Sequence, residues 1–259
     1  MKIAILYICT GKYNQFFEGF YKSCEEYWLK NEAQKEYFVF TDDLSITKAS
    51  NVHLFKKECL GFPMDSLLRF EQFLRVKELI SDFDYSFFFN ANALFVKPVG
   101  RELLPQGEDK YVAGVWKRHL NQSCLLPYER NKKSTAYIPP HDGPYVYYGG
   151  FFNGGCTKAY IEMAEQLANN TQRDLQNNII AKVHDESHLN CYLHIHPCTA
   201  LPTSYIIPEE KLKETDKPYV ILRDKVKLDP YFNKGRKTTM WARIQKGVNY
   251  LKNAVEWYI

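Results

Sequence analysis

The sequence lacks the cysteine patterns that mark disulfide-stapled or zinc-binding proteins. Its seven cysteines are odd in number and scattered, and no two of them form a C-x-x-C pair. Neither a disulfide framework nor a cysteine zinc site is therefore indicated, and a reducing, cytoplasmic location is expected. The net charge of +4 is too small to indicate a nucleic-acid partner.

Long apolar runs are also missing. The run at the amino terminus, Ile3–Ile8, is too short to span a bilayer, and no small-residue cleavage site follows it. It predicts a buried strand, and no membrane span is expected. The sequence shows no internal repeat, low-complexity tract or convincing linker, and 259 residues fit one core, so we expect a single domain.

Aromatic residues, in contrast, are abundant. They make up 15% of the sequence, including 19 Tyr and 17 Phe, in a composition that is otherwise ordinary for a globular protein. Aromatic side chains form platforms for sugars and bases, although a bulky core accounts for most of them.

The spacing of apolar residues predicts an α/β fold. Strands are expected where apolar runs are continuous, at 3–8, 37–42, 51–56 and 85–89. Helices are expected where apolar residues recur every three or four positions, at 14–30 and from Asp65 or Ser66, either of which can cap a helix, to 82. This alternation indicates a mostly parallel, twisted sheet flanked by helices. Ligands of such sheets bind beyond the carboxyl ends of the strands.

Asn90-Ala91-Asn92 follows the strand at 85–89, at the edge of the sheet where a ligand is expected. Nucleotide-sugar enzymes usually carry Asp-x-Asp at such a place, because two carboxylates hold a divalent cation against a diphosphate. Two neutral amides donate hydrogen bonds but supply no charge. We therefore expect any phosphate chemistry here to proceed without a bound metal ion.

A glycine-rich stretch occupies 145–155. Paired glycines bracket Phe151 and Phe152, so that backbone can approach a ligand closely while aromatic rings fill the space beside it. A glycine-kinked strand explains the same pattern about equally well. The turn-rich segment at 139–144 precedes this stretch; it marks either a border between two halves or, in the favoured interpretation, a surface loop.

His184-Asp185-Glu186-Ser187-His188 opens an amphipathic segment, with Asp185 and Glu186 expected in the first helical turn. Two histidines four apart can bind zinc, but the zincin pattern H-E-x-x-H needs Glu in second place. Acids at a helix start also simply complement the helix dipole. In a third interpretation, Glu186 is a buried carboxylate that faces a reacting sugar, as nucleophile or as stabiliser of a cationic centre.

Both stretches together resemble glycosyltransferase family 6. The resemblance rests on Tyr147-Tyr148-Gly149-Gly150-Phe151-Phe152 with Gly154, and on His184-Asp185-Glu186-Ser187-His188-Leu189-Asn190. The segments at 37–42, 128–130 and 136–139 look like family segments in the same order. The likeness covers most of the chain, up to about residue 237, and favours the third interpretation of Glu186.

The resemblance implies a GT-A fold, a UDP-sugar donor, a galactoside acceptor and an α-1,3 linkage made with retention of configuration. The Asn-Ala-Asn triplet and the lack of an anchor look like the bacterial branch, which is similar to blood-group A transferase and works without Mn²⁺. The expected reaction moves GalNAc from UDP-GalNAc to the 3-hydroxyl of a fucosylated β-galactoside such as 2'-fucosyllactose. The alternatives are an α-1,3-galactosyltransferase that uses UDP-galactose, or a non-catalytic nucleotide- or glycan-binding protein descended from the family.

Within the single domain, the resemblance implies a nucleotide-binding half at about 1–100, an acceptor and catalytic half at about 101–225 and a basic segment at about 226–259. Positions that match donor contacts are Ile8, Thr10 and Tyr13 for uridine, with Arg69, Asp185, Asn90, Asn92, Tyr148, Gly149 and Gly150 for the sugar and diphosphate. Glycine at 150 leaves room for a 2-acetamido group, which favours UDP-GalNAc. Glu186 matches the catalytic glutamate. The family mechanism has the acceptor attack on the face that UDP leaves, or proceeds by double displacement through a glycosyl-Glu186 intermediate.

Without a metal ion, a cation from the protein must stabilise the leaving UDP. Lys234, Arg236 and Lys237 in the basic carboxyl-terminal region are the expected contacts of the diphosphate. A solvated basic tail is the alternative. For the acceptor, the expected contacts are His184, Trp116, His119 and Glu209.

Overall fold

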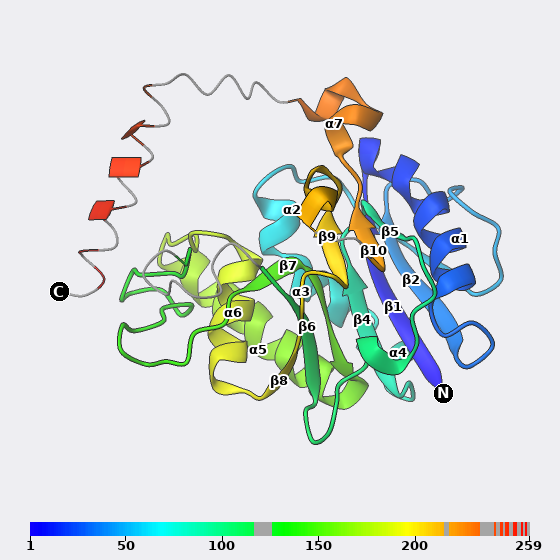
Figure 1. Ribbon diagram of the computed structural model, residues 1–259, viewed down its shortest axis with the longest axis horizontal. Coiled ribbons are helices and arrows are strands. Elements are labelled where there is room, and N and C mark those ends of the chain that lie inside the picture. The colour runs from blue at the N-terminus through cyan, green and yellow to red at the C-terminus, as the bar shows by residue number, and fades with distance from the viewer. Residues whose placement is uncertain are drawn as a thin grey trace.

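The computed structural model describes residues 1–116, 126–214 and 218–233, together with positions 241, 244, 245, 247, 248, 251, 252, 255 and 257. Its centre is a seven-stranded sheet in the order β3-β2-β1-β4-β7-β6-β8 (Figure 1). The strands are β1 (Lys2–Cys9), β2 (Gln34–Thr41), β3 (Val52–Lys56), β4 (Tyr85–Phe89), β6 (Tyr111–Val115), β7 (Tyr148–Cys156) and β8 (Cys198–Leu201). Only β7 runs antiparallel to its neighbours, β4 and β6. The expected α/β fold with a mostly parallel sheet flanked by helices is confirmed.

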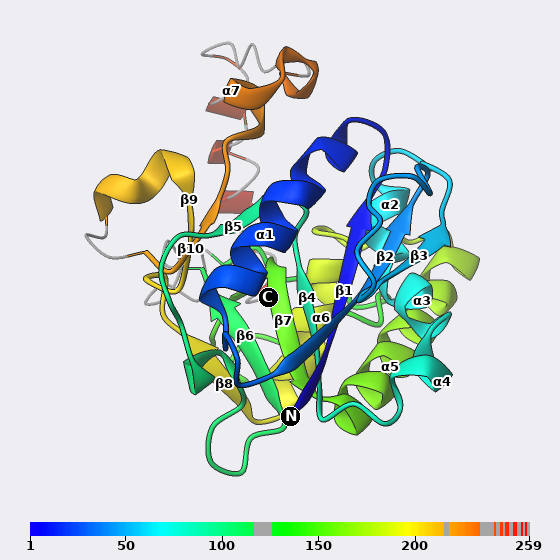
Figure 2. The same ribbon diagram turned by 90° about the vertical axis from the view of Figure 1, so that its right-hand side faces the viewer.

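The sheet lies between two layers, which explains its continuous apolar runs. On one face lie α1 (Phe17–Tyr27) and a small sheet of β5 (Ala93–Phe95), β10 (Val220–Leu222) and β9 (Ile206–Pro208). On the other lie α3 (Arg69–Leu74), α5 (Thr157–Gln176) and α6 (Asp185–Ile195), as Figure 2 shows for α3 and α5. Along β4, Phe87 and Phe89 enter the first layer and Phe88 enters the second. The two-residue period of a strand thus supplies both cores.

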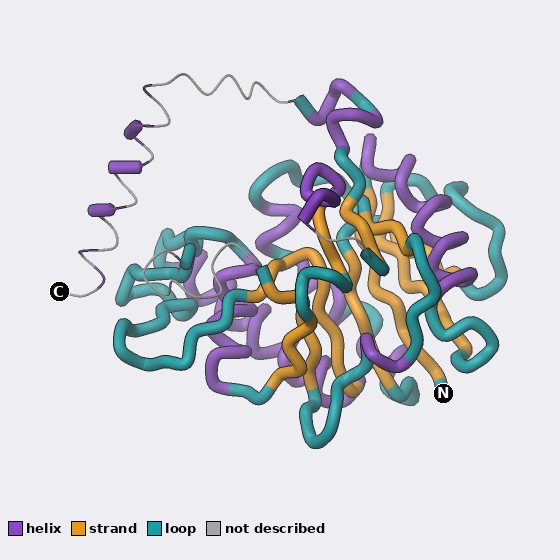
Figure 3. Tube along the Cα trace, in the orientation of Figure 1, coloured by secondary structure: helices purple, strands orange, loops and turns teal. Residues whose placement is uncertain are grey.

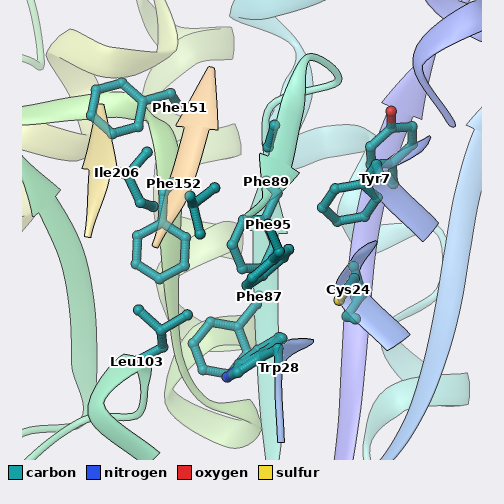
Figure 4. Close-up of a cluster of buried hydrophobic side chains, with 14 of the residues drawn as sticks. Tyr7, Cys24, Trp28, Phe87, Phe89, Phe95, Leu103, Phe151, Phe152 and Ile206 are labelled. Atoms are coloured by element: carbon teal, nitrogen blue, oxygen red, sulfur yellow. The ribbon is translucent and has the colours of Figure 1, made fainter. Parts of the chain in front are cut away.

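Aromatic side chains dominate the core on the α1 face (Figure 4). Trp28 packs edge-on against Phe87, with ring centroids 4.9 Å apart, and Tyr7 stacks on Phe20 at 4.7 Å. Most of the aromatic excess in the sequence is therefore packing, as composition indicated. Such rings bury large areas, and this rigid layer fixes the strand ends that carry polar residues.

The helix expected at 14–30 begins later, because the segment Gly11–Phe16 forms a 3-10 helix before α1 starts at Phe17. The helix expected at 65–82 is broken into α2 (Met64–Leu67), α3 and α4 (Lys77–Ile80). The capping prediction for Asp65 and Ser66 was wrong, since neither is the cap residue. The Asp65 carboxylate instead pairs with Lys57 and accepts the Gly61 amide at 2.8 Å.

The remaining elements are short. Among the elements whose bounds the structure describes, they are the 3-10 helices Arg101–Leu103, Glu209–Glu214 and Pro230–Phe232 and the single-turn α7 (Lys225–Leu228). The described residues from 126 to 147 form loops with one isolated bridge between Glu129 and Tyr137 (Figure 3). The turn-rich segment 139–144 lies in these loops, with 141–144 exposed, as the favoured interpretation has it. Among the described helices, none is both long and apolar enough to cross a membrane.

Candidate active site

Glu186 lies in the first turn of α6 and is held by two donors from the β7 side. The Tyr147 hydroxyl donates to Glu186 Oε1, and the Gly150 amide donates to Oε2 at 2.5 Å. Burial raises the pKa of Glu186 to about 7, while the two donors act in the opposite direction. A carboxylate in such a position changes its charge near neutral pH, which is typical of functional acids.

An irregularity in β7 brings the Gly150 amide to this carboxylate. In the pairing with β6, Tyr148 lies opposite Val115 and Asn153 lies opposite Ala113, so four residues of β7 face one of β6. Such bulges often aim backbone at an active site. A Cβ on Gly150 would lie 3.1 Å from both Cβ and Oε2 of Glu186. Glycine at 150 therefore allows the close approach.

The neighbouring glycines serve packing. A Cβ on Gly149 would collide with the Phe151 ring, and one on Gly154 would collide with the Phe87 ring. The side chain of Tyr148 is buried in the core beside α5 and α6. The stretch is thus a kinked, tightly packed strand whose backbone approaches the candidate catalytic group at Gly150, and a contact with a ligand stays a prediction.

Arg69 and Asp185 form a buried ion pair next to Glu186. Arg69 Nη1 lies 2.7 Å from Asp185 Oδ2 and 2.6 Å from the Gly150 carbonyl oxygen. The guanidinium also lies 4.2 Å from the centroid of the Phe88 ring. Burial raises the pKa of Asp185 to about 6, against the charge of Arg69. One arginine thereby joins α3, β7 and α6 around the candidate site.

Contacts with other elements, as well as the two acidic residues, determine the structure at the start of α6. Asp185 and Glu186 lie in its first turn as expected, but both carboxylates contact other elements. Asn190 donates to the Tyr148 carbonyl at 2.8 Å and accepts the Tyr148 amide at 2.8 Å, which binds α6 to β7. His184, before the helix, has φ 53°, a conformation that a histidine adopts at a cost. Helix capping alone does not explain this arrangement.

Zinc binding at this motif finds no support. His188 is buried, with Nε2 3.8 Å from Asp174 Oδ2, whereas the His184 ring lies 4.8 Å from that of Phe62. Within the ranges that the structure describes, no three His, Cys, Asp or Glu side chains are grouped to hold a metal ion.

The Asn90-Ala91-Asn92 triplet lies where β4 ends, and the pairing of Leu6 with Phe88 places Ile8 level with Asn90. Asn90 Nδ2 donates to Asn92 Oδ1 at 3.0 Å, and Asn92 Nδ2 donates to the Arg223 carbonyl at 2.7 Å. Mn²⁺ and Mg²⁺ prefer carboxylate oxygens. The triplet offers amides alone, which hydrogen-bond to each other and to backbone, so it lacks the carboxylates that would hold Mn²⁺ or Mg²⁺.

The segment expected to hold uridine follows β1. Thr10 is buried, and Asp42 holds the next turn by accepting the Gly11 amide at 2.8 Å and Asn14 Nδ2 at 2.7 Å. Tyr13 lies under the carboxyl-terminal segment: Lys225 Nζ is 3.3 Å from its hydroxyl, and the Phe232 ring is 4.9 Å away. Figure 1 shows α7 beside the amino-terminal end of α1. Lys225 and Phe232 therefore lie against the segment that is expected to hold uridine.

The expected acceptor contacts are only partly brought together. The Trp116 amide donates to the Tyr147 carbonyl at 2.9 Å, and its ring lies 5.6 Å from Phe151, so Trp116 is close to the Glu186 donors. Glu209 instead accepts the Asp224 amide at 2.6 Å and pairs with Lys227 at 3.2 Å. The other expected residues, His119, Lys234, Arg236 and Lys237, lie outside the described residues.

The site combines a clamped carboxylate and a buried Arg–Asp pair on α3 and α6 with a candidate nucleotide segment at the end of β1. Such a set of perturbed and paired groups beside an α/β sheet is typical of enzyme sites. The sequence matches the description "Glycosyltransferase family 6" over residues 1–226. It is 38% identical to O-antigen biosynthesis glycosyltransferase WbnI of Escherichia coli over 236 residues, 90% of this chain and 99% of that protein.

Two animal relatives are more distant. The chain is 29% identical to globoside alpha-1,3-N-acetylgalactosaminyltransferase 1 of Gallus gallus, over 82% of this chain and 64% of that protein. It is 42% identical to histo-blood group ABO system transferase 1 of Rattus norvegicus, over 32% of this chain and 22% of that protein. The protein belongs to glycosyltransferase family 6, which confirms the resemblance. It is a glycosyltransferase, and such enzymes use a nucleotide-sugar donor and a glycan acceptor.

Proposed function

We propose that this protein is a retaining α-1,3-N-acetylgalactosaminyltransferase. It moves GalNAc from UDP-GalNAc to the 3-hydroxyl of a fucosylated β-galactoside, without a metal ion. The observation that carries the proposal is the Glu186 carboxylate, oriented by Tyr147 and Gly150 and flanked by the Arg69–Asp185 pair. The similarity to a globoside alpha-1,3-N-acetylgalactosaminyltransferase favours this linkage and donor.

The active form of Glu186 is the carboxylate. Its negative charge stabilises the cationic character that develops at the anomeric carbon as the bond to UDP breaks. Because burial raises the pKa of this carboxyl to about 7, kcat/KM rises with pH through about 7 and then levels off. The Arg69–Asp185 pair presents fixed polar groups beside Glu186, and these orient the hydroxyls of the donor sugar.

Two chemical routes fit this site. In the first, the acceptor 3-oxygen bonds to the anomeric carbon on the face from which UDP leaves, and the acceptor proton passes to the departing phosphate. In the second, the Glu186 carboxylate displaces UDP to form a glycosyl ester. The acceptor 3-oxygen then bonds to the anomeric carbon, the ester bond breaks to regenerate the carboxylate, and the acceptor proton passes to the phosphate of the bound UDP. Glu186→Gln abolishes transfer by either route, and mass spectrometry of rapidly quenched enzyme with donor alone detects the ester only in the second.

A cation of the protein replaces the metal ion at the leaving group. Lys225 is the best-placed candidate in the described segments, because its ammonium lies 3.3 Å from the hydroxyl and 5.2 Å from the ring centroid of Tyr13, which is expected to flank the base. Lys225→Ala is expected to lower kcat by about tenfold or more, or about 1.4 kcal/mol of barrier. Lys227→Ala, whose ammonium pairs with Glu209, is the matched control with a smaller effect.

The proposal that the donor is UDP-GalNAc and not UDP-galactose depends more on the similarity to an N-acetylgalactosaminyltransferase than on Gly150. The direction in which a Cβ would extend from Gly150 is filled by Glu186, so this glycine has a local reason that is independent of an acetamido group. UDP-galactose therefore remains the second candidate donor.

The deciding experiment incubates the enzyme with 2'-fucosyllactose and either UDP-GalNAc or UDP-galactose in excess EDTA, with Glu186→Gln as the inactive control. Sustained GalNAc transfer supports the proposal. Faster transfer of galactose would make UDP-galactose the preferred donor. Transfer only after Mn²⁺ is added contradicts the metal-free mechanism. UDP binding by calorimetry without any transfer supports a non-catalytic binding protein.

A further inference from the structure

Trp257, near the end of the sequence, belongs to a hydrophobic cluster that also contains Tyr147, the residue that donates to Glu186. The cluster comprises Leu126, Tyr128, Ile138, Tyr147 and Trp257. Trp257 is only 2% exposed, and its indole N–H donates to the Ile138 carbonyl at 2.8 Å. The Arg130 guanidinium lies 4.9 Å from the centroid of its ring. A tryptophan enclosed and hydrogen-bonded in this way is an integral part of the cluster.

Ring contacts lead from Trp257 to Glu186. The ring centroids of Trp257 and Tyr128 are 6.3 Å apart, and those of Tyr128 and Tyr147 are 5.4 Å apart. The Tyr128 hydroxyl donates to the Val146 carbonyl at 2.9 Å, so Tyr128 also fixes the backbone before Tyr147. The Tyr147 hydroxyl then donates to Glu186 Oε1.

Backbone pairing holds the main chain of Tyr147, whose carbonyl accepts the Trp116 amide at 2.9 Å, but it leaves the direction of the Tyr147 side chain to the rings around it. Strand β7 begins at Tyr148, and the described residues 126–147 contain one isolated bridge and no helix or strand. Segments of this kind owe their local order to side-chain contacts. Loss of the Trp257 ring would leave an unfilled volume behind Tyr128 and allow Tyr147 to turn away from the carboxylate.

We propose that Trp257 is a positioning residue for Glu186, acting through Tyr128 and Tyr147. This inference rests on the proposed role of Glu186 in glycosyl transfer. The Tyr147 hydroxyl keeps Oε1 oriented and favours the charged form of the carboxyl. Trp257 holds that hydroxyl in place across the cluster. A residue that merely stabilised the fold would change the unfolding transition without changing how Glu186 titrates.

The kinetic test compares Trp257→Ala, Trp257→Phe, Tyr147→Phe and the double variant Trp257→Ala/Tyr147→Phe. Trp257→Ala and Tyr147→Phe are each expected to lower kcat by about tenfold, with the donor KM within about twofold. Both shift the acidic limb of the pH profile to higher pH, because the lost hydroxyl favoured the carboxylate. Trp257→Phe keeps most of kcat, and the double variant is no worse than Tyr147→Phe. The matched control is Trp241→Ala, since Trp241 is 77% exposed; it behaves like wild type.

A second readout does not depend on turnover. The ¹³C carboxyl resonance of Glu186, assigned by its absence in Glu186→Gln, is titrated in wild type, Tyr147→Phe, Trp257→Ala and Trp257→Phe. The expected result is a higher pKa of Glu186 in Tyr147→Phe and in Trp257→Ala, and a wild-type pKa in Trp257→Phe. A folded Trp257→Ala that titrates like wild type, or losses in kcat that add in the double variant, overturns the inference. If Trp257→Ala does not fold, Trp257→Leu replaces it under the same criteria. Failure of wild type to transfer any sugar, with these titration shifts present, overturns the proposed function instead.

Discussion

Replacing Glu186 by Gln is expected to stabilise the folded protein while it abolishes transfer. Burial raises the pKa of this carboxyl from an ordinary 4.5 to about 7, so at pH 8 the folded state holds a charge that its surroundings disfavour. Each unit of pKa difference is worth about 1.4 kcal/mol, which gives about 3 kcal/mol in total. Glutamine has nearly the same shape and carries no charge.

The hydrogen bonds offset only part of this gain. The side-chain carbonyl of the substituted glutamine can accept the Gly150 amide that now reaches Oε2, and its amino group can donate to the Tyr147 hydroxyl oxygen. The Tyr147 hydroxyl thereby loses its acceptor, which costs about 1 kcal/mol. The net expectation is that Glu186→Gln raises the free energy of unfolding by about 2 kcal/mol at pH 8. Such a trade of stability for activity is common at active sites.

The raised pKa also predicts how the stability difference between Glu186→Gln and wild type depends on pH. Between 4.5 and about 7 the folded state binds the Glu186 proton more tightly than the unfolded chain does, so wild type loses stability as pH rises through this window. The advantage of Glu186→Gln is therefore absent below about pH 4.5, grows up to about pH 7 and stays constant above it. Urea unfolding followed by tryptophan fluorescence at pH 4, 6 and 8 measures it. Glu162→Gln on the exposed side of α5 is the control, expected within about 0.5 kcal/mol of wild type. A Glu186→Gln variant no more stable than wild type at pH 8 would refute the reasoning.

Three further substitutions probe the same region. Arg69→Ala leaves the buried Asp185 unpaired and is expected to lower the free energy of unfolding in urea by about 3–5 kcal/mol. The double variant Arg69→Ala/Asp185→Asn is expected to recover part of this loss. Equal losses in the two variants would contradict the ion-pair account. Gly150→Ala places a methyl group 3.1 Å from Glu186 and is expected to lower kcat with both UDP-GalNAc and UDP-galactose. A pure switch of donor preference in that variant would show that Gly150 reads the sugar instead. Asn92→Asp is expected to lower transfer, and added Mn²⁺ does not restore it.

Strand positions could be predicted well because their cause is local. The strand Tyr85–Phe89 sends phenylalanine side chains into both cores, and it has the predicted bounds in the structure. The helix expected at 65–82 failed for a non-local reason. Asp65 binds Lys57 and loop amides, and the chain restarts as α3 at Arg69, whose side chain meets Asp185 on a distant helix. Periodicity carries no information on such contacts.

The same limit applies to the site. The glycine-rich and histidine-acid motifs indicated Gly150 and Glu186, because an unusual composition marks the residues themselves. Tyr147 stood inside a motif without an assigned role, since nothing local says where its hydroxyl points. Lys225 and Trp257 reach their partners across 212 and 119 residues of sequence. A single sequence gives no sign of contacts over such separations.

The amide at position 92 has a structural reason that bears on the proposed metal-free mechanism. Asn92 is buried; its side chain donates to the Arg223 carbonyl at 2.7 Å, and the Arg223 amide donates back to the Asn92 carbonyl at 2.9 Å. An aspartate cannot donate, and its charge would face a carbonyl oxygen, at a cost of about 1–3 kcal/mol. Arg223 leads into Lys225, which contacts Tyr13. Asn92→Asp therefore disturbs the segment that brings a cation to the nucleotide side, and does not recreate a carboxylate free to bind Mn²⁺. Transfer assays with and without Mn²⁺ test this, with Asn92→Ala as the control for simple loss of the bond. Recovery with Mn²⁺ in Asn92→Asp alone would show that a cation fits here after all.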